Sequence, residues 1–129
     1  MSETTIVKEK DSKLESLLDN YQEKLEERSD QFVKCVNCLH ILTHEDTAIS
    51  VAGNHRHVKT NPYGNTFEFR CYSEALGCAV EGPDESAHSW FPGCVWQYIY
   101  CEACNQHLGW YFHGADSFYG IRSDTIHVD

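Results

Sequence analysis

Hydrophobic and polar residues follow two different patterns along the chain. In the first part, five apolar residues recur at helical spacing and form one stripe: Leu14, Leu17, Leu18, Tyr21 and Leu25. Ser12 and Glu15 match a capping box where the stripe begins. The pattern predicts a helix from about residue 12 to 29. Two interpretations stay open for it: packing on its own domain, or self-association and partner binding through the stripe.

After residue 35 the pattern becomes typical of β-strands. Residues 48–51 and 55–58 flank Gly53-Asn54 and predict a hairpin, and residues 66–71 alternate strictly. Residues 95–101 and 108–113 predict two further strands, whereas residues 76–93 have no period and predict a long loop. We therefore expect an N-terminal helical extension over 1–34 and a mainly β domain over 35–129.

The charge balance excludes several classes of partner. The chain has 129 residues, with ten Lys and Arg against twenty Asp and Glu, for a net charge of −10. Such a surface repels phosphate backbones and anionic lipids, so we expect neither nucleic acid nor membrane as a partner. No apolar run approaches the roughly 20 residues of a membrane span. The first residues lack the basic start and apolar stretch of a secretion signal, so a cytoplasmic location is expected.

Four of the seven cysteines form two Cys-x-x-Cys pairs, Cys35/Cys38 and Cys101/Cys104. Two residues between thiolates allow a tight turn to direct both sulfurs at one ion, and two such pairs complete a closed tetrahedral zinc site. The alternative is two reduced dicysteines or redox motifs. The pattern favours one structural Zn²⁺, which leaves no open coordination position for catalysis. The three other cysteines are interpreted as small buried apolar residues: Cys71, Cys78 and Cys94.

All three tryptophans lie within a short stretch, at positions 90, 96 and 110. They could form the aromatic core of a small domain, or they could line a cup that holds a flat or compact ligand by its faces. The acidic residues just before Trp90 add a third interpretation, in which the cup reads methylated ammonium groups by cation–π attraction. These acids are Glu81, Asp84 and Glu85.

From Cys35 to about Ile126, the chain resembles the CULT domain, the thalidomide-binding domain of cereblon. The matching residues are Cys35/Cys38, Asn61-Pro62, His88-Ser89-Trp90-Phe91-Pro92-Gly93, Trp96, Cys101/Cys104, His107-Leu108-Gly109-Trp110 and Phe118-Tyr119-Gly120-Ile121. The resemblance implies a β-tent fold of two antiparallel sheets pinned by the four-cysteine zinc site.

The resemblance also implies a ligand and the residues that bind it. A cage of Trp90, Trp96 and Trp110, closed by Phe112, would take a cyclic imide such as glutarimide or succinimide. The backbone at His88, Ser89 and Trp90 would pair with the imide edge, and Asn61 and Pro62 would flank the pocket mouth. In the family, protein ends cyclised to imides and uridine-like rings are the natural ligands considered.

Two departures from the family limit what is carried over. Cys94 stands where family members often have Tyr, near the cage. The chain is also too short for the additional domain by which cereblon joins a ubiquitin ligase, so we do not expect ligase assembly.

The competing enzyme class is methionine sulfoxide reductase of the B type, which shares the zinc pairs and a similar His-Leu-Gly stretch. That enzyme needs a His where Trp110 stands and a nucleophilic Cys in a later Arg-x-Cys segment. The corresponding segment here is Ile121-Arg122-Ser123-Asp124, which has no Cys. We therefore expect a binding module with no catalytic residues.

Overall fold

Nine β-strands are present in residues 31–129, the part of the chain that the computed structural model describes. They are β1 (Phe32–Cys35), β2 (Ile41–His44), β3 (Arg56–Thr60), β4 (Thr66–Tyr72), β5 (Cys78–Glu85), β6 (Cys94–Cys101), β7 (His107–Gly114), β8 (Phe118–Arg122) and β9 (Ile126–Val128). Two short 3₁₀ helices, Glu45–Thr47 and Ser123–Thr125, follow β2 and β8. The helix predicted for residues 12 to 29 lies outside the described residues. Within residues 31–129, no helix is long and apolar enough to cross a membrane.

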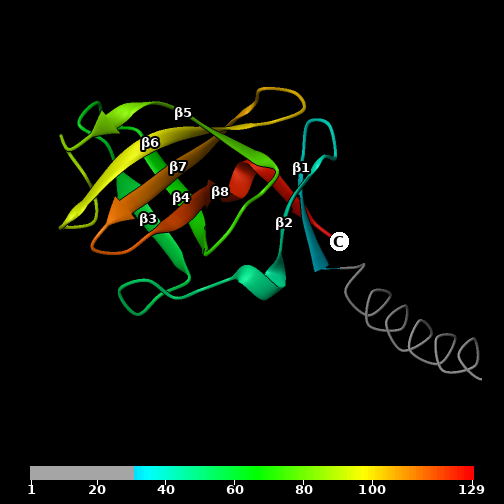
Figure 1. The fold of residues 1–129 in the computed structure, drawn as a ribbon, viewed down its shortest axis with the longest axis horizontal. Helices are drawn as coiled ribbons and strands as arrows, with labels where there is room; N and C mark the ends of the chain where they lie inside the picture. Colours follow the sequence, from blue (N-terminus) through cyan, green and yellow to red (C-terminus); the bar gives the residue numbers. More distant parts are fainter. Residues whose placement is uncertain (1–30) are drawn as a thin grey trace, which may run out of the picture. The chain divides into compact units, whose positions relative to one another are not determined.

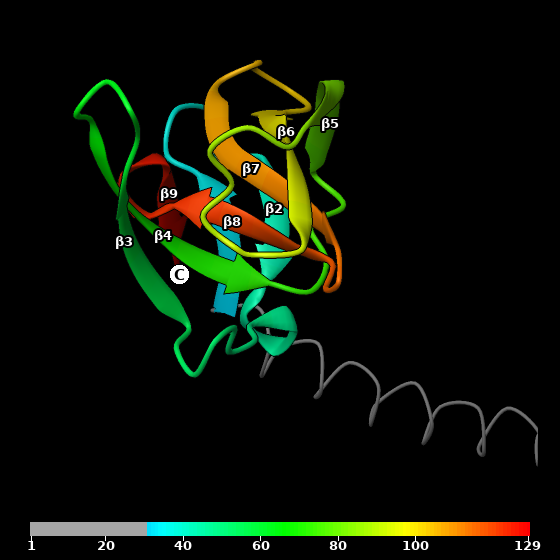
Figure 2. The ribbon, with the colours of Figure 1, turned by 90° about the vertical axis from the view of Figure 1, so that its left-hand side faces the viewer.

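The strands form two antiparallel sheets, as expected (Figure 1). The smaller sheet has the order β2-β1-β9, and the larger has the order β3-β4-β8-β7-β6-β5. Figure 2 shows β8 lying between β4 and β7, so that it joins the β3–β4 hairpin to the β5-β6-β7 meander. After β8 the chain leaves the large sheet, and β9 pairs with β1 in the small one. The chain therefore links both sheets at its C-terminal end.

Several of the predicted strands are confirmed. The alternating run gives β4, and the two aromatic runs give β6 and β7. The predicted hairpin over residues 48–58 is wrong: only its turn forms, with an isolated bridge between Val51 and Asn54, because residues 48–51 are not a strand and β3 pairs with β4 instead. The predicted long loop over residues 76–93 is wrong, because β5 occupies its first half. Strand β5 lies at the sheet edge and its residues 80–84 are all exposed, so neither face has to be apolar and no alternation results.

The buried side chains form two clusters. One joins the two sheets through large residues such as Leu42, Tyr72 and Leu108, all within 1% of complete burial. The other is aromatic and is built on Phe69 and Phe112, from strands β4 and β7 of the large sheet. Burial of such rings dominates the stability of a small domain, since each removes a large apolar area from water.

Two glycines allow the backbone and the rings to approach closely at the centre of the large sheet. Gly109 has a φ of 149°, and a Cβ there would lie 2.0 Å from the carbonyl oxygen of Gly120. At Gly120 itself, a Cβ would lie 2.9 Å from the ring of Phe69 and 3.1 Å from the ring of Phe112. The absence of side chains on β7 and β8 at this point therefore makes room for the aromatic cluster.

Candidate functional site

The two Cys-x-x-Cys turns connect β1 to β2 and β6 to β7, and they repeat one hydrogen-bonding pattern. The backbone N–H of Cys35 donates to the carbonyl of His40 at 2.9 Å, and that of Cys101 donates to the carbonyl of Gln106 at 2.8 Å. In each turn the first cysteine thus closes the hairpin five residues later. The same local sequence spacing has produced the same knuckle twice, once in each sheet.

Each knuckle also contains a residue in the left-handed conformation directly after its second cysteine. Leu39 and Asn105 both have a φ of 63°. Their N–H groups donate to the carbonyls of Cys35 and Cys101 at 2.7 and 2.8 Å. This sharp turn reverses the backbone direction before the next strand, and the sulfurs of both cysteines in each pair face the other knuckle.

A third hydrogen bond attaches each knuckle to a neighbouring segment. The N–H of Val36 donates to the carbonyl of Thr125 at 2.9 Å, and the N–H of Glu102 donates to the carbonyl of Gly77 at 3.0 Å. Gly77 lies so close to β2 that a Cβ would come within 2.0 Å of the carbonyl oxygen of Ile41. The segment before β5 therefore connects the second knuckle to the small sheet.

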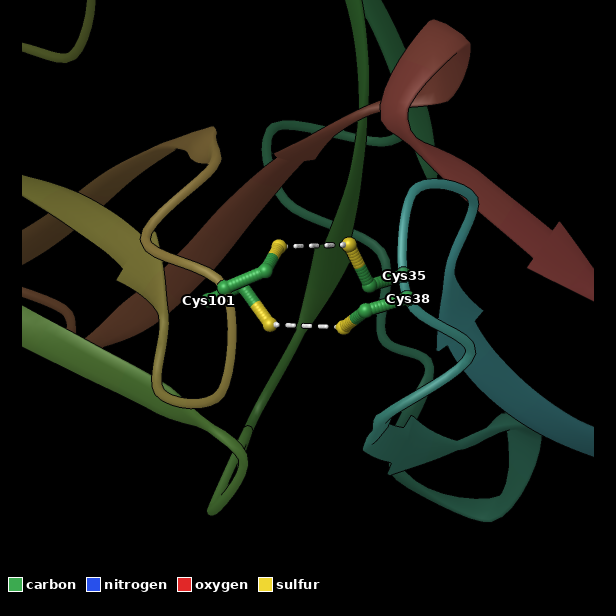
Figure 3. A group of neighbouring side chains, drawn as sticks. Cys35, Cys38 and Cys101 are labelled. Atoms are coloured by element: carbon green, nitrogen blue, oxygen red, sulfur yellow. Dashed lines mark hydrogen bonds between the residues drawn. The ribbon is translucent and has the colours of Figure 1, made fainter.

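The four sulfur atoms gather between the knuckles, as the spacing predicts (Figure 3). The Sγ atoms of Cys35 and Cys104 are 3.6 Å apart, as are those of Cys38 and Cys101, and all four lie within 4.8 Å of one another. Four Zn–S bonds of about 2.3 Å in a tetrahedron would separate the sulfurs by roughly 3.8 Å. The set therefore fits one zinc ion with little adjustment.

Hydrogen-bond donors favour the thiolate form at Cys104, whereas, despite a backbone hydrogen bond, desolvation and the neighbouring thiols raise the pKa of Cys38 to about 12. The side-chain amide of Asn37 and the backbone N–H of Gln106 lower the pKa of Cys104 to about 6. Burial raises the pKa of Cys35, which belongs to the core and lies beside the other three thiols. Four thiolates at this distance repel one another, so a dication is what holds all four deprotonated.

A pocket of about 480 Å³ lies on the large sheet, built partly on β6 and β7, the two strands that flank the second knuckle. Seven of the eight predicted ligand-binding residues line it: Asn61, Pro62, His88, Trp90, Trp96, Trp110 and Phe112. The eighth, Ser89, is not in the wall. Its hydroxyl donates to the carbonyl of Phe91 and accepts the N–H of the same residue, so it shapes the loop behind the wall.

The tryptophan rings form the aromatic part of this pocket. Trp90 and Trp110 meet edge to face, with centroids 4.9 Å apart and planes at 82°. Trp96 and Trp110 come from adjacent strands, where Trp96 is paired with Phe112 in the β6–β7 register. Trp110 is 6% exposed, whereas Trp90 and Trp96 are half-buried. Trp110 thus belongs to the buried aromatic cluster, while Trp90 and Trp96 are partly open to solvent at the pocket.

Two indole N–H groups hold the segments beside the pocket, including the loop between β5 and β6. Trp96 donates from Nε1 to the carbonyl of Ala87 at 2.9 Å, and Trp90 donates to the carbonyl of Thr60 at 3.2 Å. His88, which follows Ala87 in this loop, has a φ of 57° and an exposed side chain. A left-handed residue other than glycine stores strain, and such strain is concentrated at ligand sites.

The opposite rim is formed by the β3–β4 turn. The side-chain Oδ1 of Asn61 accepts the N–H groups of Tyr63 and Asn65 at 3.0 and 2.9 Å. The N–H of Gly64 donates to the carbonyl of Asn61 at 3.0 Å. Asn61 therefore uses its side chain to shape the turn, and Pro62 follows it at the pocket rim.

Six wall residues were not predicted as ligand-binding: Tyr63, Phe67, Glu85, Ala87, Tyr98 and His107. The alternation of β6 could have identified Tyr98, because it shares a face of that strand with Trp96. Phe67 lies on β4, which carries no residue of the predicted set. Phe67 meets Trp110 at 5.2 Å between centroids. The ring of His107 contacts the backbone: its Nε2 lies 3.0 Å from the carbonyl oxygen of Gly109, and burial lowers its pKa.

The other three cysteines are not part of the sulfur cluster. Cys71 and Cys94 are buried as predicted, and Cys78 is only half-buried. Burial raises the pKa of Cys71 and of Cys78 to about 12, which makes both thiols poor nucleophiles at neutral pH.

Comparison with known proteins assigns the β domain to a family. The sequence profile described as "Yippee zinc-binding/DNA-binding /Mis18, centromere assembly" matches residues 31–123. The chain belongs to the Yippee/Mis18 family. The family is a zinc-binding one, and the four clustered cysteines are positioned to hold that ion, so the prediction of one structural zinc is confirmed.

Within this family setting, the chain is also similar to cereblon. It is 33% identical to protein cereblon of Drosophila persimilis over an alignment of 78 residues, gaps included, that covers 53% of this chain and 12% of that protein. It is 36% identical to protein cereblon of Gallus gallus over 52 residues, which are 40% of this chain and 12% of that protein. The match thus spans about an eighth of the length of these curated relatives.

A solved structure shares the fold of this Yippee/Mis18 chain. The crystal structure of the Mis18 "Yippee-like" domain aligns with a TM-score of 0.55 and 15% sequence identity, over 77% of this chain and 94% of that domain. At this identity the likeness shows the fold alone.

Proposed function

We propose that this chain is a zinc-stabilised binding module whose tryptophan-lined pocket takes cyclic imides. The observation that carries the proposal is the convergence of Trp90, Trp96 and Trp110 on one pocket of about 480 Å³. Cereblon, whose thalidomide-binding CULT domain the sequence resembles, supplies the ligand class. Glutarimide and succinimide rings, thalidomide-like compounds, cyclised protein ends and uridine-like rings all belong to this class.

The chemistry of an imide is complementary to this pocket. Its ring is apolar and compact, and its edge presents an acceptor, a donor and a second acceptor. Apolar faces suit the indole rings, whereas the polar edge needs backbone groups that have no other partner. Within residues 31–129, the backbone groups of His88 and Trp90 make no hydrogen bond of their own. They are the partners that we assign to the imide edge, with Asn61 and Pro62 at the rim.

The proposal is one of binding without catalysis. Four sulfur ligands close the zinc site, so the ion has no position for water or substrate. The partner would be a small imide or a modified protein end, in the cytoplasm, and the proposal includes no ubiquitin ligase assembly. The family description names DNA binding, but residues 35–129 of this chain carry four basic and eleven acidic residues, a balance that disfavours phosphate backbones.

One observation favours a second candidate, a reader of methylated ammonium groups. Glu85 lies in the pocket wall together with the tryptophans. A carboxylate beside aromatic faces is the arrangement that attracts a quaternary ammonium ion. Of the three acids predicted for this role, Asp84 instead accepts from His113 at 2.9 Å, and Glu81 is exposed outside the wall.

The test is a titration of tryptophan fluorescence with glutarimide, using zinc-loaded protein. We expect saturable quenching that is lost in Trp96→Ala, a half-buried position, and in Trp110→Ala if that variant folds. Tyr100→Phe, outside the pocket wall, is the control and should bind as the native protein does. The absence of any response from folded native protein would overturn the imide proposal, and saturation with tetramethylammonium instead would support the second candidate.

A further inference from the structure

Glu85 is the last residue of β5 and lies directly opposite Trp96 in the β5–β6 register. It is half-buried, whereas the five residues before it are exposed. Its side chain lines the pocket, and within residues 31–129 that side chain makes no hydrogen bond or ion pair. The Glu85 carboxylate therefore lies beside the aromatic side chains of the pocket and has no hydrogen-bond or ion-pair partner in the described part of the chain.

No Lys or Arg of the wall neutralises this charge, and Glu85 is the acid among the lining residues described. The basic side chains of the wall are the imidazoles of His88 and His107, and neither forms an ion pair with Glu85 in the described part of the chain. His113 on β7, a basic group near this edge of the sheet, is engaged by Asp84. A carboxylate that is partly desolvated gains most from a positively charged hydrogen-bond donor, and such charge-assisted bonds are about twice as strong as neutral ones.

The pocket is also larger than the ring proposed for it. Pockets of about 300–1,000 Å³ hold drug-sized molecules, and this one has about 480 Å³. A lone glutarimide fills only a small part of such a space. Tyr63 and Tyr98 line part of the remaining wall, and both are exposed to solvent. The pocket therefore has room for a ligand portion outside the imide ring, and this portion would pass Glu85 or its neighbours.

We propose that Glu85 selects cyclic imides that carry a cationic group beyond the ring, namely protein ends in which a Lys or Arg residue precedes the cyclised residue. The proposal rests on the function proposed above for the pocket. The imide enters the tryptophan cage, the peptide leaves through the open side, and the basic side chain pairs with the Glu85 carboxylate. Glu85 is in this way a specificity-determining residue and not part of the cage.

The test uses two synthetic peptides that end in aminoglutarimide and differ at the preceding residue, which is Lys in one and Nε-acetyl-lysine in the other. Acetylation keeps the four-carbon stem of the side chain and replaces its charge with a small neutral amide. For the native protein we expect the Lys peptide to bind about three- to tenfold tighter at low salt, as for a partly exposed ion pair. The ratio should approach one at high salt, because screening weakens a partly exposed pair.

Two variants separate a local contact from the general acidic field. Glu85→Gln should bring the ratio of the two affinities to about one by weakening the binding of the Lys peptide. Glu81→Gln removes the same charge from the same strand but outside the pocket wall, and it should keep the ratio. Saturable binding of the acetylated peptide by Glu85→Gln shows that this variant folds with a working pocket.

The outcomes distinguish the two proposals. Equal affinities of the native protein for both peptides would overturn the selection by Glu85 and leave imide binding in place. A preference that survives in Glu85→Gln, or that disappears equally in Glu81→Gln, would also overturn it. Failure of both peptides and of free glutarimide to bind would overturn the imide function itself.

Discussion

Leu39 and Asn105 occupy equivalent positions in the two zinc knuckles, with the same φ of 63° and the same hydrogen bond back to the first cysteine. One is an apolar residue that is 61% exposed, and the other is a residue type that tolerates this conformation well. The two turns share this geometry because both must direct two sulfurs at one point, although the residue type at the left-handed position differs. Leu39 is consequently the more strained of the two.

Leu39→Gly should therefore stabilise the zinc-loaded domain. Relief of the left-handed strain is worth about 1–2 kcal/mol, and the greater freedom of glycine in the unfolded chain offsets about half of it. We expect a gain of about 0.5–1 kcal/mol in the free energy of unfolding, measured by urea denaturation. Asn105→Gly is the matched control and should gain less. A larger gain at Asn105 would contradict the strain argument.

Removal of the metal should unfold residues 31–129. The knuckles belong to different sheets, and the binding energy of a structural zinc is folding energy, with apparent values of about 10–16 kcal/mol in small zinc domains. Chelation of zinc, or Cys101→Ser, should abolish the cooperative unfolding transition seen by circular dichroism. Elemental analysis should find one zinc per native chain. Cys78→Ser, a cysteine outside the ligand set, should keep that zinc, and its loss there would contradict the four-ligand assignment.

Tyr72 predicts how stability responds to alkaline pH. Its side chain is fully buried and its hydroxyl donates to Glu45 at 2.9 Å, and burial followed by the Glu45 charge raises the pKa of Tyr72 above its unfolded value of about 10. Because the pKa of Tyr72 is higher in the folded protein than in the unfolded chain, its contribution to the free energy of unfolding is fully present below about pH 10. That contribution is lost progressively as the pH rises above this value. The loss from this one group should approach about 1.4 kcal/mol per pH unit.

Tyr72→Phe isolates this effect, since other buried thiols and phenols titrate in the same range. The variant should be less stable at about pH 8, by about 1 kcal/mol for the lost hydrogen bond. It should then lose less stability than the native protein between about pH 10 and 11, as measured by urea denaturation at each pH. Parallel pH profiles for the two proteins would show that Tyr72 ionises freely in the folded state.

Trp96 and Trp110 should separate binding from stability. Trp110 is 6% exposed within the aromatic core, and its replacement by Ala should cost about 3–5 kcal/mol in the free energy of unfolding. Trp96 is half-buried at the open side, so Trp96→Ala should cost about 1–2 kcal/mol. We expect both variants to lose imide binding by more than about tenfold in a calorimetric titration. Retained affinity in a folded Trp96→Ala protein would place the ligand elsewhere.

Prediction from the sequence was strongest where the chemistry is local. The spacing of Cys35/Cys38 and Cys101/Cys104 identifies the four metal ligands, because two residues between the cysteines are enough to form each knuckle. The alternation of residues 66–71 likewise predicts β4, since one face of that strand is buried. Prediction failed for β5, an edge strand whose central residues face water on both sides.

The sequence by itself thus determined the zinc ligands, the aromatic strands and seven of the residues around the pocket, because these depend on spacing within short segments and on a resemblance carried by short motifs. Only the tertiary structure decided that Glu85 lies in the wall opposite Trp96 while Glu81 and Asp84 do not. All three acids precede Trp90 in one stretch and are indistinguishable by composition. The β5–β6 register, with its shift between Glu81 and Glu85, is what orients one carboxylate towards the tryptophans.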